Sequence, residues 1–288
     1  MYKDFSKWNL YEGFSFGSGT SKQEWIVNEN NGKIGLFKDR KSDKTTDNFS
    51  EKIASHIANI IDLPCADIDL AIRNNRVGMV SYKINSESEN IIEGIQFISN
   101  LYPNYNRDKL IDEDTGEKYS LEIILNSIRG LNLERDLFKI FIFDFLIGNT
   151  DRHHSNWAIL MNNETKNYSI CPVYDNASSL CSYVSDDHIT RSINDEMWVK
   201  SQFDSKSKSL IRIKGKKVKH SDFVKYLKEN FYLETIEFVN NIKIKFTNNA
   251  IDDVINSYNK LLSNEKISLL KIYLKSKVKM LLSIYELT

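Results

Sequence analysis

Apolar and polar residues alternate along several short stretches in the first third of the chain. In residues 33–40, KIGLFKDR, the alternation places Ile34, Leu36 and Lys38 on one face of a strand. Phe37 falls on the other face. Similar apolar runs predict strands at residues 23–27, 66–73 and 76–84, the last two joined by a turn at Asn74-Asn75. The chain is therefore expected to begin with a small β-sheet.

Longer apolar repeats predict helices elsewhere. Residues 47–63 carry isoleucines at helical spacing. Residues 132–147, NLERDLFKIFIFDFLI, become almost wholly apolar in their second half, which is typical of a buried central helix. Gly148 can end that helix in the left-handed conformation. Residues 231–288 also have a helical pattern.

Together these patterns predict an α+β protein. A small lobe of sheet and helix would span about residues 1–84, and a mostly helical lobe residues 85–288.

Composition narrows the possible functions. The chain has 288 residues, 41% of them hydrophobic and 27% charged, with zero formal net charge. A neutral chain has no global field that would recruit nucleic acid or an anionic membrane, so neither partner is expected. No apolar run approaches the roughly 20 residues of a membrane span, and the N-terminus lacks the apolar core of a secretory signal. The expected location is therefore cytoplasmic, and the three cysteines are expected to be buried thiols.

The residues with the clearest chemistry follow the predicted central helix. Asp151 and Asn156 stand five positions apart in DRHHSN, and Asp175 follows the apolar run 168–173. A hairpin whose first strand is 157–160 would return Asp175 to the side of Asn156. This layout is typical of phosphoryl transfer, in which an Asp accepts the substrate hydroxyl proton and an Asn and an Asp hold Mg²⁺ against the phosphates of ATP. The alternative is a surface loop with ordinary polar residues.

Two N-terminal features fit the same chemistry. The segment around Gly17, Ser18 and Gly19 is glycine-rich and leads into a strand, so it resembles the cover over ATP in kinases more than a P-loop. Lys38 ends an apolar strand shortly afterwards, where a ligand of the α- and β-phosphates is expected. A polar surface hairpin and a solvated lysine are the alternatives.

The motifs GNTDRHHSN and PVYDNAS resemble the catalytic and metal-binding motifs of the HipA-like kinases, and most closely the stand-alone, CtkA-like branch. DRHHSN is also similar to the DRH-x-x-N of phosphoinositide kinases. The resemblance implies a two-lobed protein-kinase-like fold, with a small β-sheet N-lobe and a mostly helical C-lobe, and a Ser/Thr protein kinase that uses ATP and Mg²⁺. Full-length HipA carries an additional N-terminal segment, whereas this sequence begins almost at the glycine-rich loop, so the resemblance leaves open both an antitoxin-like partner and the substrate.

Further site residues follow from motif order. Glu51 lies near the start of the helix 47–63, matches the family motif, and is expected to pair with Lys38; a helix-start acid stabilised by the helix dipole is the alternative. Ser81, Tyr82 and Lys83 are expected to form the hinge that contacts adenine. The DRH similarity implies that His153 donates to the γ-phosphate, with a structural hydrogen bond as the rival role.

The resemblance also implies autophosphorylation in the loop 15–21, with Ser18 as the first choice of acceptor. The basic segment 206–219 is expected to be a solvated hairpin, with a docking surface for an acidic partner as the alternative. A lipid or small-molecule kinase and a non-catalytic ATP-binding scaffold are the rival functions. Arg152 and His154 have no role that the sequence supports.

Overall fold

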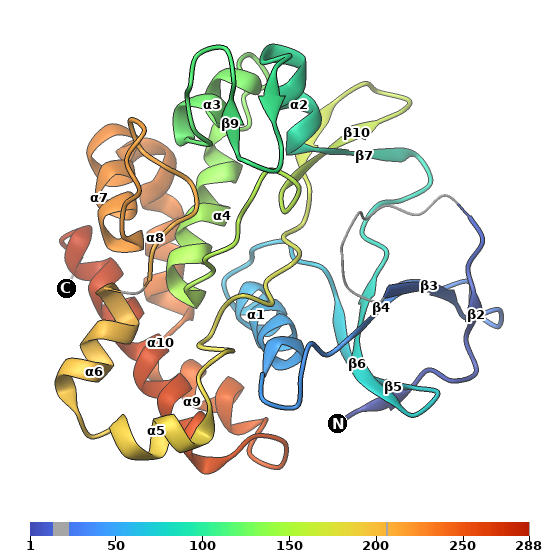
Figure 1. Cartoon of the computed structure of the whole chain (residues 1–288), viewed down its shortest axis with the longest axis vertical. Helices are drawn as coiled ribbons and strands as arrows, with labels where there is room; N and C mark the ends of the chain where they lie inside the picture. Colours follow the sequence, from blue (N-terminus) through green and yellow to red (C-terminus); the bar gives the residue numbers. More distant parts are fainter. Residues whose placement is uncertain (14–22, 206, 288) are drawn as a thin grey trace.

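The computed structural model describes residues 1–13, 23–205 and 207–287, with strands at one end and helices at the other (Figure 1). In the larger sheet the strand order is β1-β5-β6-β4-β3-β2, and only the β1–β5 pair is parallel. Each of the four stretches predicted to be strands in the first third of the chain contributes one. The strands are β1 (Lys3–Asp4), β2 (Asn9–Leu10), β3 (Gln23–Val27), β4 (Ile34–Asp39), β5 (Ile68–Arg73) and β6 (Arg76–Tyr82).

The register of this sheet determines which way Lys38 faces. Lys38 pairs with Met79, and Met79 pairs with Leu70, so all three side chains lie on one face. Leu70 belongs to the main core, which identifies this face as the one turned toward the helices. Phe37 is fully buried on the opposite face, in a small cluster with Phe5, Ile26, Ala71 and Val80. The alternation predicted for residues 33–40 is confirmed.

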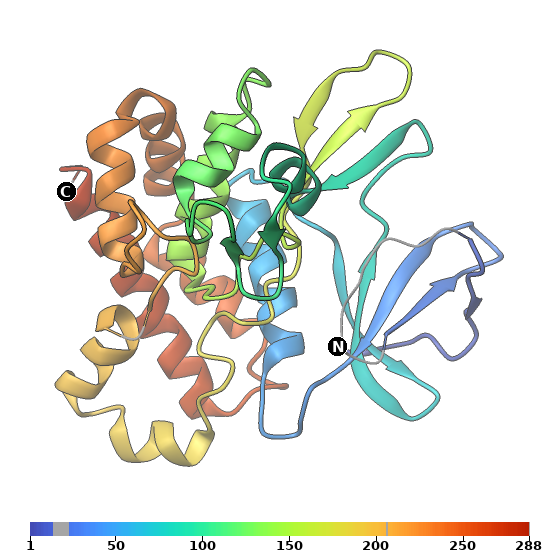
Figure 2. The same cartoon turned by 45° about the horizontal axis from the view of Figure 1, so that its top comes forward.

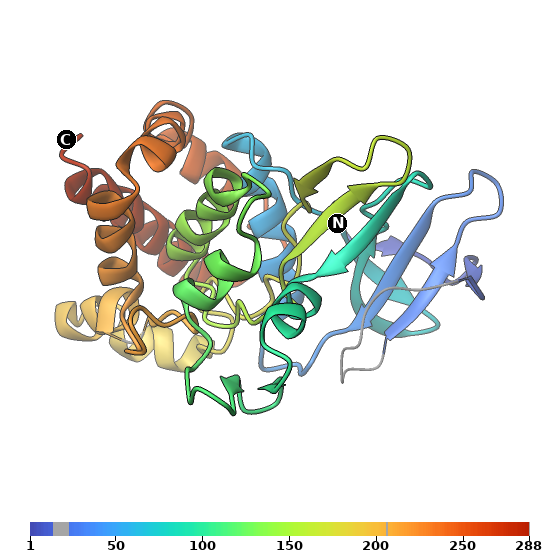
Figure 3. The same ribbon diagram turned by 90° about the horizontal axis from the view of Figure 1, so that it is seen from above.

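Helix α1 (Asp47–Ile60) lies between the sheet and the other helices (Figures 1 and 3). Its isoleucines at positions 53 and 57 are buried, and they belong to the same core as α4. The helix ends at Ile60, three residues before the predicted end, because Asp62 adopts a left-handed conformation with φ of 52°.

Helix α4 (Glu134–Ile147) is the buried central helix that the sequence predicts. It is buried without interruption from Ile140 to Ile147, and Gly148 ends it with φ of 68°. The helices besides α1 and α4 are α2 (Gly94–Leu101), α3 (Leu121–Ser127), α5 (Asp186–Ser192), α6 (Glu196–Lys200), the π-helical turn η1 (Ser201–Ser205), α7 (His220–Asn230), α8 (Tyr232–Lys245), α9 (Asn248–Asn256) and α10 (Asn264–Ile284). Helices α7, α8 and α10 lie on the side of α4 away from the large sheet, whereas α2 and α3 lie above α4 in the view of Figure 1.

A second sheet of three strands lies beside the large sheet, above it in the view of Figure 2. Its hairpin, β10 (Ala158–Asn162) and β11 (Tyr168–Ile170), confirms the predicted hairpin before Asp175. The third strand, β7 (Glu89–Glu93), pairs antiparallel with β10 and was expected to be loop or helix. It was missed because ENIIE is short and its partner is distant in the sequence. A small pair, β8 (Tyr105–Asn106) and β9 (Ile111–Asp112), completes the described strands.

Backbone hydrogen bonds connect the segment that follows the hairpin to the segment that precedes β5. Ala66 N–H donates to the carbonyl of Val173 at 2.9 Å, and Val173 N–H donates to that of Pro64 at 2.8 Å. These bonds fix the chain two residues before Asp175. The boundary expected near residue 84 stays a prediction, because α1 shares its core with the helices beyond that point. Within the described residues, no helix combines the length and apolar character needed to cross a membrane.

Candidate active site

The loop after α4 presents Asp151 at the surface. Asn149 lies under this loop, donating from its side chain to Asp144 at 3.2 Å and accepting the N–H of Asp151 at 3.0 Å. The carboxylate of Asp151 is left exposed. Partial removal from water raises its pKa, with His153 opposing this shift and Asp175 adding to it. A raised pKa suits a group that accepts a proton from a hydroxyl.

Asn156 is buried and oriented by the same loop. Its side-chain nitrogen donates to the carbonyl of Asp151 at 2.8 Å. The amide oxygen is therefore the atom left to coordinate a cation, in keeping with the preference of Mg²⁺ for oxygen. Asn156 is held in the orientation that its predicted role requires.

Asp175 lies where the hairpin meets the large sheet, in the left-handed region with φ of 55°. One carboxylate oxygen is 3.6 Å from the Lys38 ammonium, so the two residues predicted to act on phosphate and metal are brought together. Burial would raise the pKa of Asp175, but Lys38 and Arg152 more than offset it and lower that pKa. Asp175 is thereby kept ionised, as a metal ligand must be.

Lys38 and Glu51 do not form the direct ion pair that was predicted. Among the ion pairs of the described residues Lys38 contacts Asp175, whereas Glu51 accepts the backbone N–H of Asn176 at 2.8 Å. Glu51 is 2% exposed, and burial, together with Asp175, raises its pKa to about 7. Glu51 still acts on Lys38 through space, because both carboxylates raise the pKa of Lys38 against the effect of burial. The direct contact of Glu51 is therefore with the segment that carries Asp175, and not with Lys38.

Arg152, for which the sequence indicated no role, joins the two motifs. Its guanidinium is 2% exposed and pairs with Asp144 on α4 at 2.7 Å. One nitrogen donates to the carbonyls of Asn156 and Tyr174, both at 2.7 Å, and another donates to the side chain of Asn176 at 2.8 Å. Arg152 therefore fixes both segments that carry the presumed metal ligands.

The two histidines of the loop have different environments. The Nδ1 atom of His153 accepts the N–H of Ser155 at 3.2 Å, which confirms a structural hydrogen bond and leaves the proton on Nε2. The ring of His154 is buried edge-on against Tyr105 and Tyr119. Burial lowers the pKa of His154 to about 4, so it is a neutral packing residue.

The predicted hinge needs correction. The N–H of Tyr82 donates to the carbonyl of Asp67 at 2.9 Å, and that of Lys83 donates to the carbonyl of Ile34 at 3.0 Å. Ser81 is paired on both sides, with Leu36 and with Ile68. Because β6 lies inside the sheet, its ladder uses these donors, so the N–H groups of Tyr82 and Lys83 cannot also bind adenine.

An apolar surface follows directly after this strand. Ile84 packs against one cluster from the large sheet and another from the small sheet, and Tyr174 joins the same two clusters. Their buried members are Ala66, Ile68, Met79, Ala158, Leu160 and Cys171. The sequence did not indicate this surface, because its residues come from five separate segments.

Two further predictions concern the glycine-rich segment and the metal site. Gly17, Ser18 and Gly19 lie outside the described residues. No cluster of three or more His, Cys, Asp or Glu side chains suited to a metal occurs in the described part of the chain. A site built from one carboxylate and one amide differs from such a cluster, and it fits Mg²⁺, which keeps several waters and takes its other ligands from phosphates.

The comparisons with known proteins agree with this geometry. The chain belongs to the family of the HipA-like C-terminal domain, which matches residues 8–241. A serine/threonine-protein kinase of Helicobacter pylori, CtkA, is 26% identical over 139 residues, which are 46% of this chain and 40% of that protein. The match thus spans less than half the length of this curated relative.

Solved structures show the same fold. The crystal structure of CtkA, described as a proinflammatory kinase of Helicobacter pylori, superposes with a TM-score of 0.82 over 100% of both chains at 18% identity. HipA of Shewanella oneidensis MR-1, solved with HipB and operator DNA, gives a TM-score of 0.59 at 14% identity, covering 96% of this chain and 68% of that one. The predicted kinase-like α+β fold is confirmed.

Proposed function

We propose that this protein is a Ser/Thr protein kinase of the HipA type that transfers the γ-phosphoryl group of ATP with the help of Mg²⁺. The observation that carries the proposal is the 3.6 Å contact of Lys38 with Asp175, on a segment that Arg152 ties to Asn156. Residues from two distant motifs are thus assembled in the layout that phosphoryl transfer needs. The names of the CtkA relative support the same activity.

Each residue has a defined task in this proposal. Asp151 accepts the proton of a Ser or Thr hydroxyl as that oxygen attacks. Lys38 offsets charge on the α- and β-phosphates, and Asn156 and Asp175 hold Mg²⁺, which neutralises charge on the transferring group when bound. Glu51 would act on the ATP site indirectly, by positioning the segment that carries Asp175.

His153 is suited to donate to the γ-phosphate. Ser155 occupies Nδ1, so the ring can donate only from Nε2 while it is neutral. The structural bond and the proposed donor role are therefore compatible in one tautomer. The adenine ring is assigned to the apolar surface formed by Ile84 and Tyr174.

Autophosphorylation in the loop 15–21 remains part of the proposal, with Ser18 as the preferred acceptor. A phosphate there would add about −1.5 to −2 charges beside those of ATP, so it is expected to lower activity. Intact mass and peptide mapping after incubation with Mg-ATP test this point. An active enzyme that gains no phosphate on residues 15–21 would rule it out.

The basic hairpin around residues 206–219 is kept as a docking surface for an acidic partner. Part of its charge is already neutralised, because Lys219 pairs with Asp204 at 2.8 Å. The lysines at 208, 214, 216 and 217 are exposed or half-buried.

The deciding experiment measures transfer from radiolabelled ATP to a generic protein substrate, to inositol lipids and to the enzyme itself. Protein labelling that requires Mg²⁺ and is lost in Asp151→Asn would support the proposal. Labelling of lipid alone would replace it with a lipid kinase, and nucleotide binding without any transfer would indicate a scaffold.

A further inference from the structure

A small cavity opens beside the proposed catalytic base. It has a volume of about 140 Å³ and lies between the end of α4 and the segment that follows Asp175. In Figure 1 this segment runs between α4 and α10. The lining residues are Gly148, Thr150, Ser178, Ser179, Cys181, Ser182, Tyr183, Val184, Ser207 and Tyr273. Thr150 precedes Asp151 directly, so an occupant would lie close to the attacking hydroxyl.

The lining of this cavity is unusually rich in hydroxyl groups. The hydroxyl of Ser182 is buried and has no hydrogen-bond partner among the described residues. A buried polar atom without a partner is costly, and a bound group or water normally satisfies it. At the rim, the Tyr183 hydroxyl lies 3.4 Å from that of Ser178 and accepts from Lys41 at 3.1 Å.

Two buried lysines of α10 lie behind residues that line the cavity. Lys277 donates to the Ser207 hydroxyl at 3.1 Å, and Lys266 donates to the carbonyl of Cys181 at 2.7 Å. Each lysine is 1% exposed, and neither has a carboxylate within ion-pair distance in the described part of the chain. His220, which also contacts Ser207, is kept neutral because burial lowers its pKa to about 3. A buried ammonium without a counter-ion favours an anion nearby.

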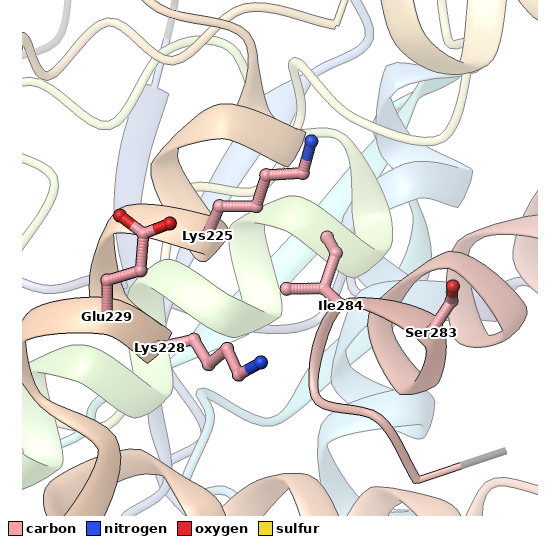
Figure 4. A pocket seen from close by; sticks show the side chains of 5 residues that line it. All are labelled: Lys225, Lys228, Glu229, Ser283 and Ile284. Carbon is pink, nitrogen blue, oxygen red and sulfur yellow. The ribbon is translucent and has the colours of Figure 1, made fainter.

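A second hollow in the molecule lacks these features. It lies between α7 and α10 and is lined by Lys225, Lys228, Glu229, Ser283 and Ile284 (Figure 4). Its lysine side chains extend in different directions in Figure 4, and Lys228 already pairs with Glu286 at 2.5 Å. It offers no group of convergent polar atoms.

We propose that the cavity beside Thr150 is a specificity pocket for an anionic side chain of the acceptor polypeptide, adjacent in sequence to the phosphorylated Ser or Thr. The Ser182 hydroxyl would bind the anion directly, with Lys277, which is bonded to Ser207, as the nearby counter-ion. A carboxylate and a phosphate share this chemistry and both fit the cavity volume. The inference rests on the proposed kinase activity and adds to it a preference for substrate sequence.

The experiment compares peptides with one Ser and a single variable neighbour: Gln, Glu or phosphoserine, placed in turn at each flanking position. At one position an anionic neighbour should raise kcat/KM about tenfold, mainly through KM, as expected for one charge-assisted hydrogen bond. Glu and phosphoserine peptides distinguish the two sources of the anion. In Lys277→Met the preference should disappear and in Ser182→Ala it should fall several-fold, with kcat/KM for the Gln peptide unchanged within about twofold.

Tyr285→Phe provides the matched control, because the Tyr285 hydroxyl is also buried without a partner but does not line the cavity. It should keep the full preference. Equal kcat/KM for Gln, Glu and phosphoserine peptides in the wild type would overturn the inference, as would an equal loss for all three in Lys277→Met.

Binding separates this inference from the proposed activity. Fluorescence anisotropy of labelled peptides on the Asp151→Asn variant should show tighter binding of the anionic peptide, and Lys277→Met in that background should abolish the difference. If binding shows this preference while no peptide is ever phosphorylated, the kinase proposal fails and the pocket stands. If peptides are phosphorylated but neither measurement shows a preference, the pocket fails and the kinase proposal stands.

Discussion

At the scale of single residues, the side chains with the most contacts are not those with the clearest motif chemistry. Asp151 is exposed, and its side chain is left free for a substrate, whereas the neighbouring Arg152 is buried and uses both ends of its guanidinium. A site that must bind and release ligands leaves its reactive groups unsatisfied, so rigidity has to come from the residues beside them. In this site Asp151 is the proposed reactive group, and the adjacent Arg152 supplies the rigidity.

The proposed catalytic role of Asp151 leads to the first prediction. Asp151→Asn removes the proton acceptor but keeps the shape of the loop, since Asn156 and His153 contact only the backbone of Asp151. Phosphoryl transfer should fall about 10² to 10⁴-fold, whereas calorimetry should find Mg-ATP binding within a few-fold of the wild type. Wild-type turnover in this variant would remove Asp151 from the mechanism.

The second prediction concerns Arg152. Arg152→Met leaves Asp144 buried without its cation, so the free energy of unfolding should fall by about 3–5 kcal/mol in urea titrations. Arg135→Met is the control, because the pair of Arg135 with Glu237 is exposed and should contribute less than about 1 kcal/mol. Similar losses for the two variants would mean that Arg152 does not hold the motifs together.

At the scale of elements, the sequence pattern predicted those features that depend only on residues close together in the chain. The face of β4 that carries Lys38 follows from alternation, and the buried end of α4 follows from its apolar run. The sequence did not show that the N–H groups of Tyr82 and Lys83 are already used by neighbouring segments of the sheet, because the identity of a strand's neighbours is not a local property. Arg152 was missed for the same reason, since its partners lie on α4 and beyond β11.

Helix α10 provides the third prediction. Burial lowers the pKa of Lys277 from 10.5 to about 7, so the folded state gives up its proton more readily than the unfolded chain. Stability should therefore rise as the pH increases from about 7 toward 10.5, where only the unfolded state still holds the proton. Lys277→Met lacks this dependence and should be more stable than the wild type by roughly 1–4 kcal/mol near pH 6. The advantage should shrink as the pH approaches 10.

The matched control lies on the same helix. Lys275 is partly exposed and pairs with Asp252 at 2.7 Å, so Lys275→Met should change stability by less than about 1 kcal/mol, with no such pH dependence. Thermal unfolding at several pH values measures both variants. A Lys277→Met protein that is less stable than the wild type near pH 6 would show that Lys277 is not an uncompensated charge in the folded protein.

At the scale of the whole molecule, α1 and the segment after Asp175 couple the sheet to the helices. Ser50 donates to the carbonyl of Ser179 at 3.0 Å, Glu51 accepts from Asn176, and Thr46 N–H donates to the carbonyl of Ser182 at 3.0 Å. These bonds connect the start of α1, the Asp175 segment and the proposed specificity pocket. A ligand bound by Lys38 and Asp175 would therefore stabilise both parts of the molecule together.

This coupling leads to the last prediction. A nucleotide at 100 times its Kd should stabilise the folded protein by about 2.7 kcal/mol, and calorimetry should show one shifted transition rather than two. Lys38→Ala should weaken ATP binding with and without Mg²⁺, because in the proposed site the ammonium contacts phosphate directly. Asp175→Ala should remove only the part of the stabilisation that requires Mg²⁺, since it deletes a metal ligand and leaves Lys38 without its carboxylate. If Mg-ATP still raises the unfolding temperature of Asp175→Ala as much as that of the wild type, Asp175 does not hold the metal; if Lys38→Ala responds normally to ATP in EDTA, Lys38 does not bind phosphate.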